Sequence, residues 1–323
     1  MPAWLPSASL DTLRLRARLL AQTRAFFYAR GVWEVETPLL SQAATPDPHI
    51  HSFAVSASTG AEPRYLHTSP EFPMKRLLAA GSGSIYQICK VFREGEVGRR
   101  HNPEFTLLEW YRIGFDLPAL MEEVDILIRE LLREGDSECL ALGDTQYFSY
   151  TEALQRFSGL DEPLNADITV LQNCARSHGL DVPALGDEHD AWLDLLMSHV
   201  VEPALPRDCP VFIYDYPVSQ AALAQIRGDV AERFELYLNG MELANGFHEL
   251  ADAAEQRQRF EAENQRRLQM GLPVMPLDTH FLTALEQGLP DCSGVALGFD
   301  RLLMLIAGKT DIAAVLSFAC ERA

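Results

Sequence analysis

Alternation of apolar and polar positions predicts a pair of strands around a basic loop. Residues 91–111 contain a loop rich in Arg and Gly between two apolar segments that are typical of strands. Because successive side chains of a strand point to opposite sides, Phe105, Leu107, Glu109 and Tyr111 are predicted to share one face. That face would offer a ring for stacking, then a carboxylate and a phenol.

A second pair of strands is predicted on either side of Asn239-Gly240. An Asn-Gly pair between two apolar runs is typical of a type I′ turn, which needs positive φ at both positions. In that register Tyr237 faces Glu242, and Glu235 lies diagonal to Glu242 on the same face, roughly 7–8 Å away. The turn therefore predicts two neighbouring carboxylates.

Two carboxylates at that separation repel each other unless a cation lies between them. Mg²⁺ prefers a few carboxylate oxygens and completes its shell with substrate phosphates. Glu235 and Glu242 are therefore candidate Mg²⁺ ligands. The alternative is an exposed face that carries two ordinary glutamates.

Helical spacing of apolar residues predicts further elements elsewhere in the chain. The predicted helices are residues 10–27, residues 120–131 with an end near Gly135, residues 193–200, and a polar helix with a solvated face at 252–269. A buried strand is predicted at 211–214.

Gly294 and Gly298 precede an apolar helical run in which Arg301 enters at the helix start. Small residues let a backbone approach a ligand closely, and a helix start favours an anion. The spacing matches no dinucleotide fingerprint, and the Gly-Ser stretch at 81–84 lacks the Lys of a P-loop. His248-Glu249 is no zinc-protease motif, because position 252 is Asp rather than His.

Composition is that of an ordinary globular protein, with 323 residues, 47% hydrophobic and 23% charged. The sequence has no 18-residue apolar run and no signal peptide, so we expect neither a membrane protein nor a secreted one. Its six cysteines are scattered without a Cys-x-x-Cys pair, which favours reduced thiols in the cytoplasm over disulfides or zinc.

The formal net charge is −19, from 46 acidic and 27 basic residues. Nucleic-acid affinity comes mainly from cationic groups that displace counterions, so this chain is expected to be a poor tRNA binder. The basic loop at Arg99-Arg100 could instead contact an acidic protein partner.

Together these segments resemble the catalytic core of class II aminoacyl-tRNA synthetases, and the lysyl branch in particular. The resemblance runs from about residue 10 to the C-terminus and implies an α+β fold, an antiparallel β-sheet flanked by helices. The matching segments are Phe92-Arg93 with 101–106 (motif 2), 298–301 (motif 3), 31–38 (motif 1), and 68–71 with 75–78, which holds the amino acid's α-amine.

A lysyl-tRNA synthetase carries an anticodon-binding barrel before motif 1, and here only one helix precedes residue 31. We therefore expect a single catalytic domain, 1–323, without an anticodon-binding domain. Residues 217–224 also lack the usual Ser-Pro-Leu pattern. Both features are similar to the family of ligases that modify elongation factor P.

That resemblance implies an ATP-dependent ligase. It activates a lysine-type amino acid, β-lysine in this family, as the adenylate and passes it to the ε-amine of a lysine on elongation factor P. It also implies a homodimer built on residues 31–42.

The resemblance implies the following roles. Arg93 and Arg301 are the catalytic residues that clamp the α-phosphate. The ATP-binding residues are these two with Glu94, Gly95, His101, Asn102, Phe105 (under adenine), Glu242, Leu243 and Gly298; Mg²⁺ is held by Glu235 and Glu242. The substrate-binding residues are Ser69, Pro70, Glu71 (α-amine), Glu109, Tyr111 and Glu249 (distal ammonium), Asn245 (carboxylate) and Ala296.

Two positions depart from the lysyl pattern. After Arg93 the pattern is usually Asn-Glu, and here it is Glu94-Gly95-Glu96, so either glutamate or a backbone carbonyl must contact the adenine amino group. Ala296 stands where lysyl-tRNA synthetases usually have Gly. One extra methyl group would crowd an α-amine, and we hypothesise that it favours β-lysine over α-lysine.

Two other functions stay open. A truncated synthetase that acylates a tRNA or a small acceptor would need a large basic patch. A non-catalytic sensor of lysine or ATP would be expected to lack a phosphate-binding arginine or a metal carboxylate, and Arg93, Arg301, Glu235 and Glu242 are all present.

Overall fold

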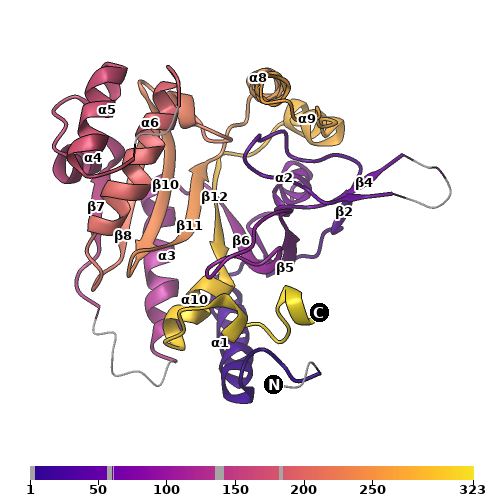
Figure 1. Cartoon of the computed structure of the whole chain (residues 1–323). Coiled ribbons are helices and arrows are strands. Elements are labelled where there is room, and N and C mark those ends of the chain that lie inside the picture. Colours follow the sequence, from indigo (N-terminus) through magenta and orange to yellow (C-terminus); the bar gives the residue numbers. More distant parts are fainter. Residues whose placement is uncertain (1–3, 57–59, 61, 135–141, 182–184) are drawn as a thin grey trace. The chain divides into compact units, whose positions relative to one another are not determined.

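The computed structural model describes residues 4–56, 60, 62–134, 142–181 and 185–323. The chain divides into two compact units (Figure 1). Unit 1 comprises Met1–Ser137 and Glu249–Ala323, and unit 2 is the intervening segment Glu138–His248. Residue 135, where a predicted helix was expected to end, lies outside the described residues.

Unit 1 is built on strands in the spatial order β1-β5-β6-β12. The β5–β6 and β6–β12 pairs are antiparallel, whereas β1 pairs with β5 in parallel. A smaller sheet has the order β2-β4-β3. The bounds are β1 Trp33–Glu34, β2 Leu40–Ser41, β3 Ala54–Val55, β4 Arg64–Leu66, β5 Ile85–Phe92, β6 Glu104–Ile113 and β12 Cys292–Gly298.

Four helices of unit 1 begin at a Ser or Asp cap whose side chain accepts a backbone hydrogen bond. In the first of them the side chain of Ser9 accepts a hydrogen bond from the Thr12 amide, and Leu15, Leu19 and Phe26 are buried. The bounds are α1 Leu10–Ala29, α2 Glu71–Ala79, α3 Leu117–Leu132, α8 Ala253–Gln269, α9 Thr279–Gln287 and α10 Phe299–Ile306, with short 3₁₀ helices at Ile312–Ala314 and Cys320–Arg322.

Helix α8, which lies beside α9 in Figure 1, is less solvated than its composition predicted. Its polar sequence still buries a stripe at Gln256, Phe260, Asn264 and Arg267. Arg267 is only 1% exposed, and its guanidinium donates to the carbonyl oxygens of Pro273 and Asp47. Arg267 and Asn264 can thus lie on a buried face because backbone carbonyls accept hydrogen bonds from them.

Unit 2 has strands in the order β11-β10-β8-β7, and β9 also pairs with β10. Its core is a cluster of buried side chains that includes Trp192, Leu196 and Ile213. The bounds are β7 Gln146–Ser149, α4 Tyr150–Ser158, α5 Ile168–Ser177, α6 His189–Leu196, a π turn at Met197–Val201, α7 Glu202–Ala204, β8 Val211–Pro217, β9 Ile226–Arg227, β10 Val230–Leu238 and β11 Met241–His248, with 3₁₀ helices at Pro163–Asn165 and Val218–Gln220.

The predicted α+β class is confirmed, with one correction to the sheet. Strands are antiparallel around the predicted site residues, but the β1–β5 and β7–β8 pairs are parallel. Helices α4 to α7 join β7 to β8, and a helical crossover returns the chain in the same direction.

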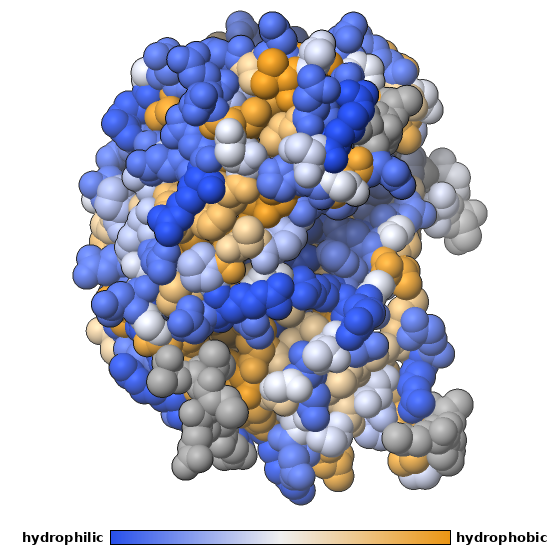
Figure 2. All heavy atoms as spheres, turned by 60° about the vertical axis from the view of Figure 1, so that its left-hand side comes forward, coloured by the Kyte–Doolittle hydropathy of each residue, from blue (hydrophilic) through white to orange (hydrophobic). Residues whose placement is uncertain are grey.

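The described part of the chain includes no helix that is long and apolar enough to span a membrane. Hydrophilic residues cover most of the face shown in Figure 2, with hydrophobic residues in smaller patches between them.

Candidate active site

A buried carboxylate lies near the middle of β6 in unit 1. Glu109 is 2% exposed, and its two oxygens accept hydrogen bonds from Ser69 Oγ and Tyr111 Oη, each at 2.7 Å. Ser69 itself accepts from the amide of Glu71, at the start of α2. The predicted neighbourhood of Glu109, Tyr111, Ser69 and Glu71 is therefore present in one place.

A buried lysine completes this group. Lys75 Nζ lies 2.6 Å from Glu71 Oε1 and 2.5 Å from Glu249 Oε2, and its side chain is fully buried. Glu249 follows the last residue of β11, where its amide donates to the Cys292 carbonyl of β12. We call Glu71, Lys75, Glu109, Tyr111 and Glu249 the carboxylate cluster.

The carboxylate cluster shifts the proton affinities of its members. Burial raises the pKa of Glu109 to about 8, and the negative charges of Glu71 and Glu249 add to this, while the Tyr111 and Ser69 hydroxyls oppose it. Burial also raises the pKa of Tyr111. For Lys75 burial alone would lower the pKa, but the charges of Glu249 and Glu71 outweigh it and raise the pKa above its usual value.

Strand β12 leaves space for the carboxylate cluster because it has small residues on the facing side. Gly294 is the register partner of Tyr111, and Ala296 is that of Glu109. A Cβ atom at Gly294 would lie 2.4 Å from Glu249 Oε1 and from the Tyr111 ring. Only glycine fits at that position, whereas the methyl group of Ala296 projects from the same face, two residues further on.

The predicted phosphate ligands also meet within unit 1. Arg301, in the first turn of α10, donates from Nη2 to His101 Nε2 at 2.7 Å. Burial lowers the pKa of His101, and the charges of Arg301 and Arg93 lower it further, so the imidazole is neutral and can accept this bond. Two residues that are 200 positions apart in the chain thus form one basic group.

Arg93 lies over the Phe105 ring, with its guanidinium carbon 5.1 Å from the ring centroid, and pairs with Glu96 at 3.5 Å. Glu94 is exposed, and Gly95 has a φ of +83°, a value that suits glycine in a tight loop. The loop thus gives Glu96 the contact with Arg93. It leaves Glu94 as the more open candidate for the adenine amino group.

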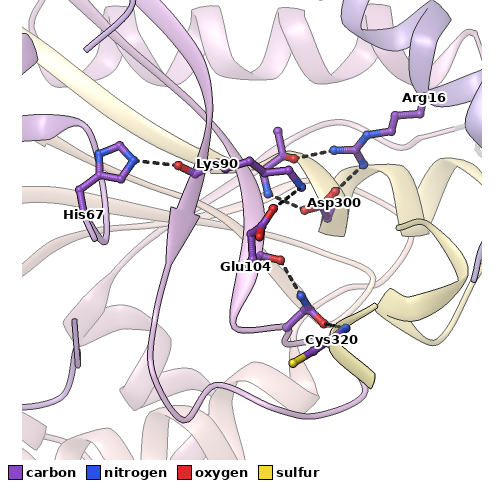
Figure 3. A network of polar contacts seen from close by, with 8 residues as sticks. Arg16, His67, Lys90, Glu104, Asp300 and Cys320 are labelled. Carbon is purple, nitrogen blue, oxygen red and sulfur yellow. Dashed lines mark hydrogen bonds and ion pairs between the residues drawn. The ribbon is translucent and has the colours of Figure 1, made fainter. Parts of the chain in front are cut away.

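A polar network fixes the start of α10 (Figure 3). Asp300 is 1% exposed and binds Arg16 of α1, while the Thr106 amide donates to its second oxygen at 2.6 Å. Arg16 also donates to Thr106 Oγ1 at 2.6 Å. Asp300 directly precedes Arg301 in the first turn of α10. The network therefore fixes the backbone from which the Arg301 side chain extends.

Asn102, a predicted ATP-binding residue, has its side chain engaged within the fold. Its amide nitrogen donates to the Glu104 carbonyl, and its oxygen accepts from the amide of Cys320 near the C-terminus (Figure 3). Pro70 lies at the N-cap of α2, and Gly298 holds the same place before α10. Their predicted roles in binding stay predictions.

The predicted hairpin is present in unit 2, with one irregularity that the sequence interpretation missed. Asn239 and Gly240 have φ of +52° and +68°, and Tyr237 faces Glu242 as expected. Beyond that pair the register shifts, so that Leu243 is an extra residue and Glu235 pairs with Asn245. The bulge puts Asn245 on the face that carries Glu235 and Glu242.

Arg233 organises this face of the hairpin. Its guanidinium donates to Glu235 Oε1 at 2.5 Å, to Asn245 Oδ1 at 3.3 Å and to the Gln220 carbonyl at 3.0 Å. Tyr237 Oη donates to the other oxygen of Glu235 at 2.5 Å. Because Arg233 binds the Asn245 oxygen, the Asn245 amide nitrogen is left as a donor suited to a carboxylate.

The donor set on the hairpin suits Mg²⁺ in type, since Glu235 and Glu242 are carboxylates on one face. Over the described ranges, no group of three or more His, Cys, Asp or Glu residues is arranged to hold a metal ion. An ion bound at this face would therefore depend on phosphate oxygens or water for most of its shell.

Three residues of these sites were not assigned individual roles by the sequence interpretation: Arg16, Lys75 and Arg233. Lys75 follows Glu71 by four residues, a spacing usually associated with an exposed helical ion pair. Gly294 was predicted to let the backbone approach a ligand closely, but its contacts with Glu249 and Tyr111 were not predicted. Nothing local to Arg16 or Arg233 marked either as a partner of a site residue.

Comparison with known proteins identifies the family of the chain. The family model described as tRNA synthetases class II (D, K and N) matches residues 5–322. The proteins named elongation factor P–(R)-β-lysine ligase from Salmonella arizonae, Salmonella dublin and Salmonella heidelberg are each 49% identical over 331 residues, covering 99% of this chain and 98% of each relative. The chain therefore belongs to the class II tRNA synthetase family, and within it to the family of the elongation factor P–(R)-β-lysine ligases.

Proposed function

We propose that the protein is an AMP-forming ligase that activates (R)-β-lysine with ATP and transfers it to a lysine ε-amine of elongation factor P. The observation that carries the proposal is the carboxylate cluster, where Glu109, Tyr111 and Glu249 are buried against Gly294. A buried carboxylate needs a charged partner, and a substrate ammonium supplies one. The near full-length identity to ligases of that name supports the acceptor.

The first step forms a bond between a carboxylate oxygen of the amino acid and the α-phosphorus of ATP, and pyrophosphate leaves. Negative charge on the phosphate oxygens is met by fixed positive charge, for which Arg301 and Arg93 are the proposed residues. His101 would hold the outer phosphates, and Phe105 would lie under the adenine ring.

In the second step the lysine ε-amine attacks the acyl carbon, and AMP leaves. No side chain of the protein needs to form a covalent intermediate. Mg²⁺, when bound, would neutralise phosphate charge, and the proposed ligands are Glu235 and Glu242. Glu71 is proposed to meet the amine near the reacting end of the substrate, and Asn245 its carboxylate.

The single catalytic domain, the cytoplasmic location and the homodimer belong to the same proposal. Reduced thiols support the cytoplasm, since Cys89, Cys174, Cys292 and Cys320 are free thiols. Exposed apolar side chains support the dimer. Tyr28 is 86% exposed and Trp33 55%, and both line a surface hollow of about 610 Å³ between α1 and β1, apart from the carboxylate cluster.

The test is a reaction of the protein with ATP, each lysine isomer and purified elongation factor P, followed by the intact mass of the factor. We expect a mass gain equal to one lysine residue, on a larger fraction of the factor with the β isomer than with the α isomer. A parallel reaction with tRNA tests the main alternative, and acylation of tRNA but not of the factor would overturn the proposed acceptor. Adenylate formation without transfer to either would point to another acceptor.

A further inference from the structure

The carboxylate cluster contains more acid groups than cations. Glu71, Glu109 and Glu249 provide three carboxyl groups, and Lys75 is the cation that binds two of them, at 2.6 Å and 2.5 Å. Glu109 instead accepts hydrogen bonds from two neutral hydroxyl groups, those of Ser69 and Tyr111. The three acids are therefore not equivalent.

Burial makes this difference matter. The side chains of Lys75 and Glu249 are 0% and 1% exposed, and Glu109 is 2% exposed. A buried carboxylate that lacks a cation is costly, and neighbouring carboxylates add repulsion. A hydroxyl group stabilises a carboxylate less than an ammonium does, so the cluster lowers its energy by keeping one proton.

The groups around Glu109 indicate that Glu109, rather than Glu71 or Glu249, is the acid that keeps the proton. Tyr111 on β6 is neutral, because burial raises its pKa further. Glu71 from α2 and Glu249 beyond β11 are negative and paired with Lys75, and Cys89 on β5 is a neutral thiol whose pKa burial raises to about 12. None of these groups neutralises an ionised Glu109, whose pKa is raised to about 8.

We propose that Lys75 fixes the charges of Glu71 and Glu249, so that Glu109 holds a proton in the substrate-free enzyme and releases it when the substrate ammonium binds. The inference rests on the proposed function, because it takes an amino acid with a distal ammonium as the ligand. The carboxylic acid loses its proton to the buffer, and the carboxylate then pairs with the ammonium. Lys75 is a positioning residue here, since it acts through the carboxylates.

The consequence is a linkage between substrate binding and pH. An ammonium remains charged up to about pH 10. The number of protons released when the substrate binds therefore depends on how far the carboxyl group of Glu109 is protonated beforehand. Below about pH 8 the affinity for the lysine-type substrate is expected to rise about tenfold per pH unit, and above it to level off.

Isothermal titration calorimetry with (R)-β-lysine and with L-lysine, in buffers of different ionisation enthalpy, measures the protons released. We expect close to one proton per site at pH 7 and close to none at pH 9.5. Glu109→Gln is expected to bind more weakly and to release close to none at pH 7. The matched control is Lys90→Gln, which removes a 41% exposed lysine on neighbouring β5 and should leave the count unchanged.

Lys75→Gln separates positioning from a purely structural role. Loss of the Lys75 cation removes the positive charge that pairs with Glu71 and Glu249, so more than one acid should hold a proton and the number of protons released should rise above one. An unchanged count in a folded Lys75→Gln protein would refute the role of Lys75. If that variant does not fold, Glu109→Gln carries the test, and release equal to wild type would overturn the proposal.

Infrared spectroscopy of the substrate-free protein separates this inference from the proposed function. The wild-type spectrum minus that of Glu109→Gln should contain a protonated carboxyl band at pH 7, which is lost as the pH rises past about 8; Glu263, whose pKa burial also raises to about 8, contributes to both spectra and cancels. Absence of the band from this difference overturns the inference while leaving ligase activity intact. If neither lysine isomer binds, the proposed function and the release step both fail, while the band still supports the proton on Glu109.

Discussion

Arg301 donates a hydrogen bond to His101 at 2.7 Å, although 200 residues separate them in the chain. The contact joins the start of α10 to the loop between β5 and β6. Burial and the nearby arginines lower the pKa of His101, so the pair carries one positive charge rather than two. The hydrogen bond fixes the orientation of each side chain relative to the other.

Arg301→Ala should leave the fold intact and abolish most adenylate formation. Removing one preorganised charge contact typically costs about 10²–10³ in rate. ATP–pyrophosphate exchange measures it, with Arg257→Ala as the control, because Arg257 is 43% exposed and pairs only loosely with Glu286 at 3.8 Å. Exchange near the wild-type rate in a folded Arg301→Ala protein would refute the assignment.

Arg233→Lys should weaken the response to Mg²⁺. Arg233 donates to Glu235, Asn245 and the Gln220 carbonyl at once, and a lysine ammonium cannot hold that planar set. Loss of a group that orients a metal ligand typically costs about 10–100-fold in metal affinity or activity. The measurement is the Mg²⁺ concentration for half-maximal ATP–pyrophosphate exchange.

Arg227→Lys is the control for Arg233, since Arg227 lies on β9 of the same unit and its side chain is 66% exposed. It should respond to Mg²⁺ like wild type. Identical curves for the two variants would mean that Arg233 does not position the carboxylate.

The hairpin illustrates which parts of the site the sequence could predict. The turn at Asn239 and Gly240 was predictable because positive φ is a local demand of the backbone. The bulge at Leu243 was not inferred, although its neighbour Ala244 is also buried and two successive buried residues break the strand period. Strict alternation therefore predicted correctly that Glu235 and Glu242 share one face of the hairpin. It did not predict that Asn245 lies on the same face, because that depends on the bulge.

Lys75 illustrates a limit of another kind. A helical Glu–Lys pair four residues apart has the same sequence whether it is exposed or buried. Here β6 and β12 bring Glu109 and Gly294 to the same place, and only that packing turns the pair with Glu71 into part of a buried cluster. The family motifs located the segment, but charge balance within it required the three-dimensional arrangement.

Glu109→Gln should remove a dependence of stability on pH. The pKa of Glu109 is raised to about 8 in the folded protein, so its contribution is fully present below its unfolded pKa and is lost as the pH rises through 8. Between those values the folded state holds the extra proton, and the contribution falls by about 1.4 kcal/mol per pH unit.

The free energy of unfolding, measured by urea denaturation from pH 5 to 9, gives the difference between wild type and Glu109→Gln. That difference should shift in favour of the glutamine variant as the pH rises. A difference that stays constant would show that Glu109 titrates alike in the folded and unfolded states.

Trp33→Arg should convert the proposed dimer to a monomer. Trp33 is 55% exposed beside Tyr28, and a charge there would oppose burial against a second copy. Light scattering on dilute samples measures the mass. Tyr147→Arg in unit 2 replaces another exposed aromatic residue, 46% exposed, and should not change it. A wild-type protein that is monomeric yet active would refute the dimer.

Ala296→Gly should shift substrate preference from β-lysine toward α-lysine. Ala296 is the register partner of Glu109, so its methyl group projects beside the carboxylate cluster, where an α-amine would be crowded. A β-amino acid carries its amine one carbon further along and avoids that contact. Discrimination by one methyl group is worth roughly 10–200-fold, so the preference should be clear but incomplete.

The measurement is the ratio of kcat/KM for the two isomers in ATP–pyrophosphate exchange, for wild type and Ala296→Gly. Gly294→Ala is the contrasting variant, because its new Cβ would lie 2.4 Å from Glu249 Oε1 and the Tyr111 ring. Crowding there displaces groups proposed to hold the distal ammonium, which both isomers share, so activation of both should fall together. An unchanged ratio in Ala296→Gly would mean that another part of the pocket selects the isomer.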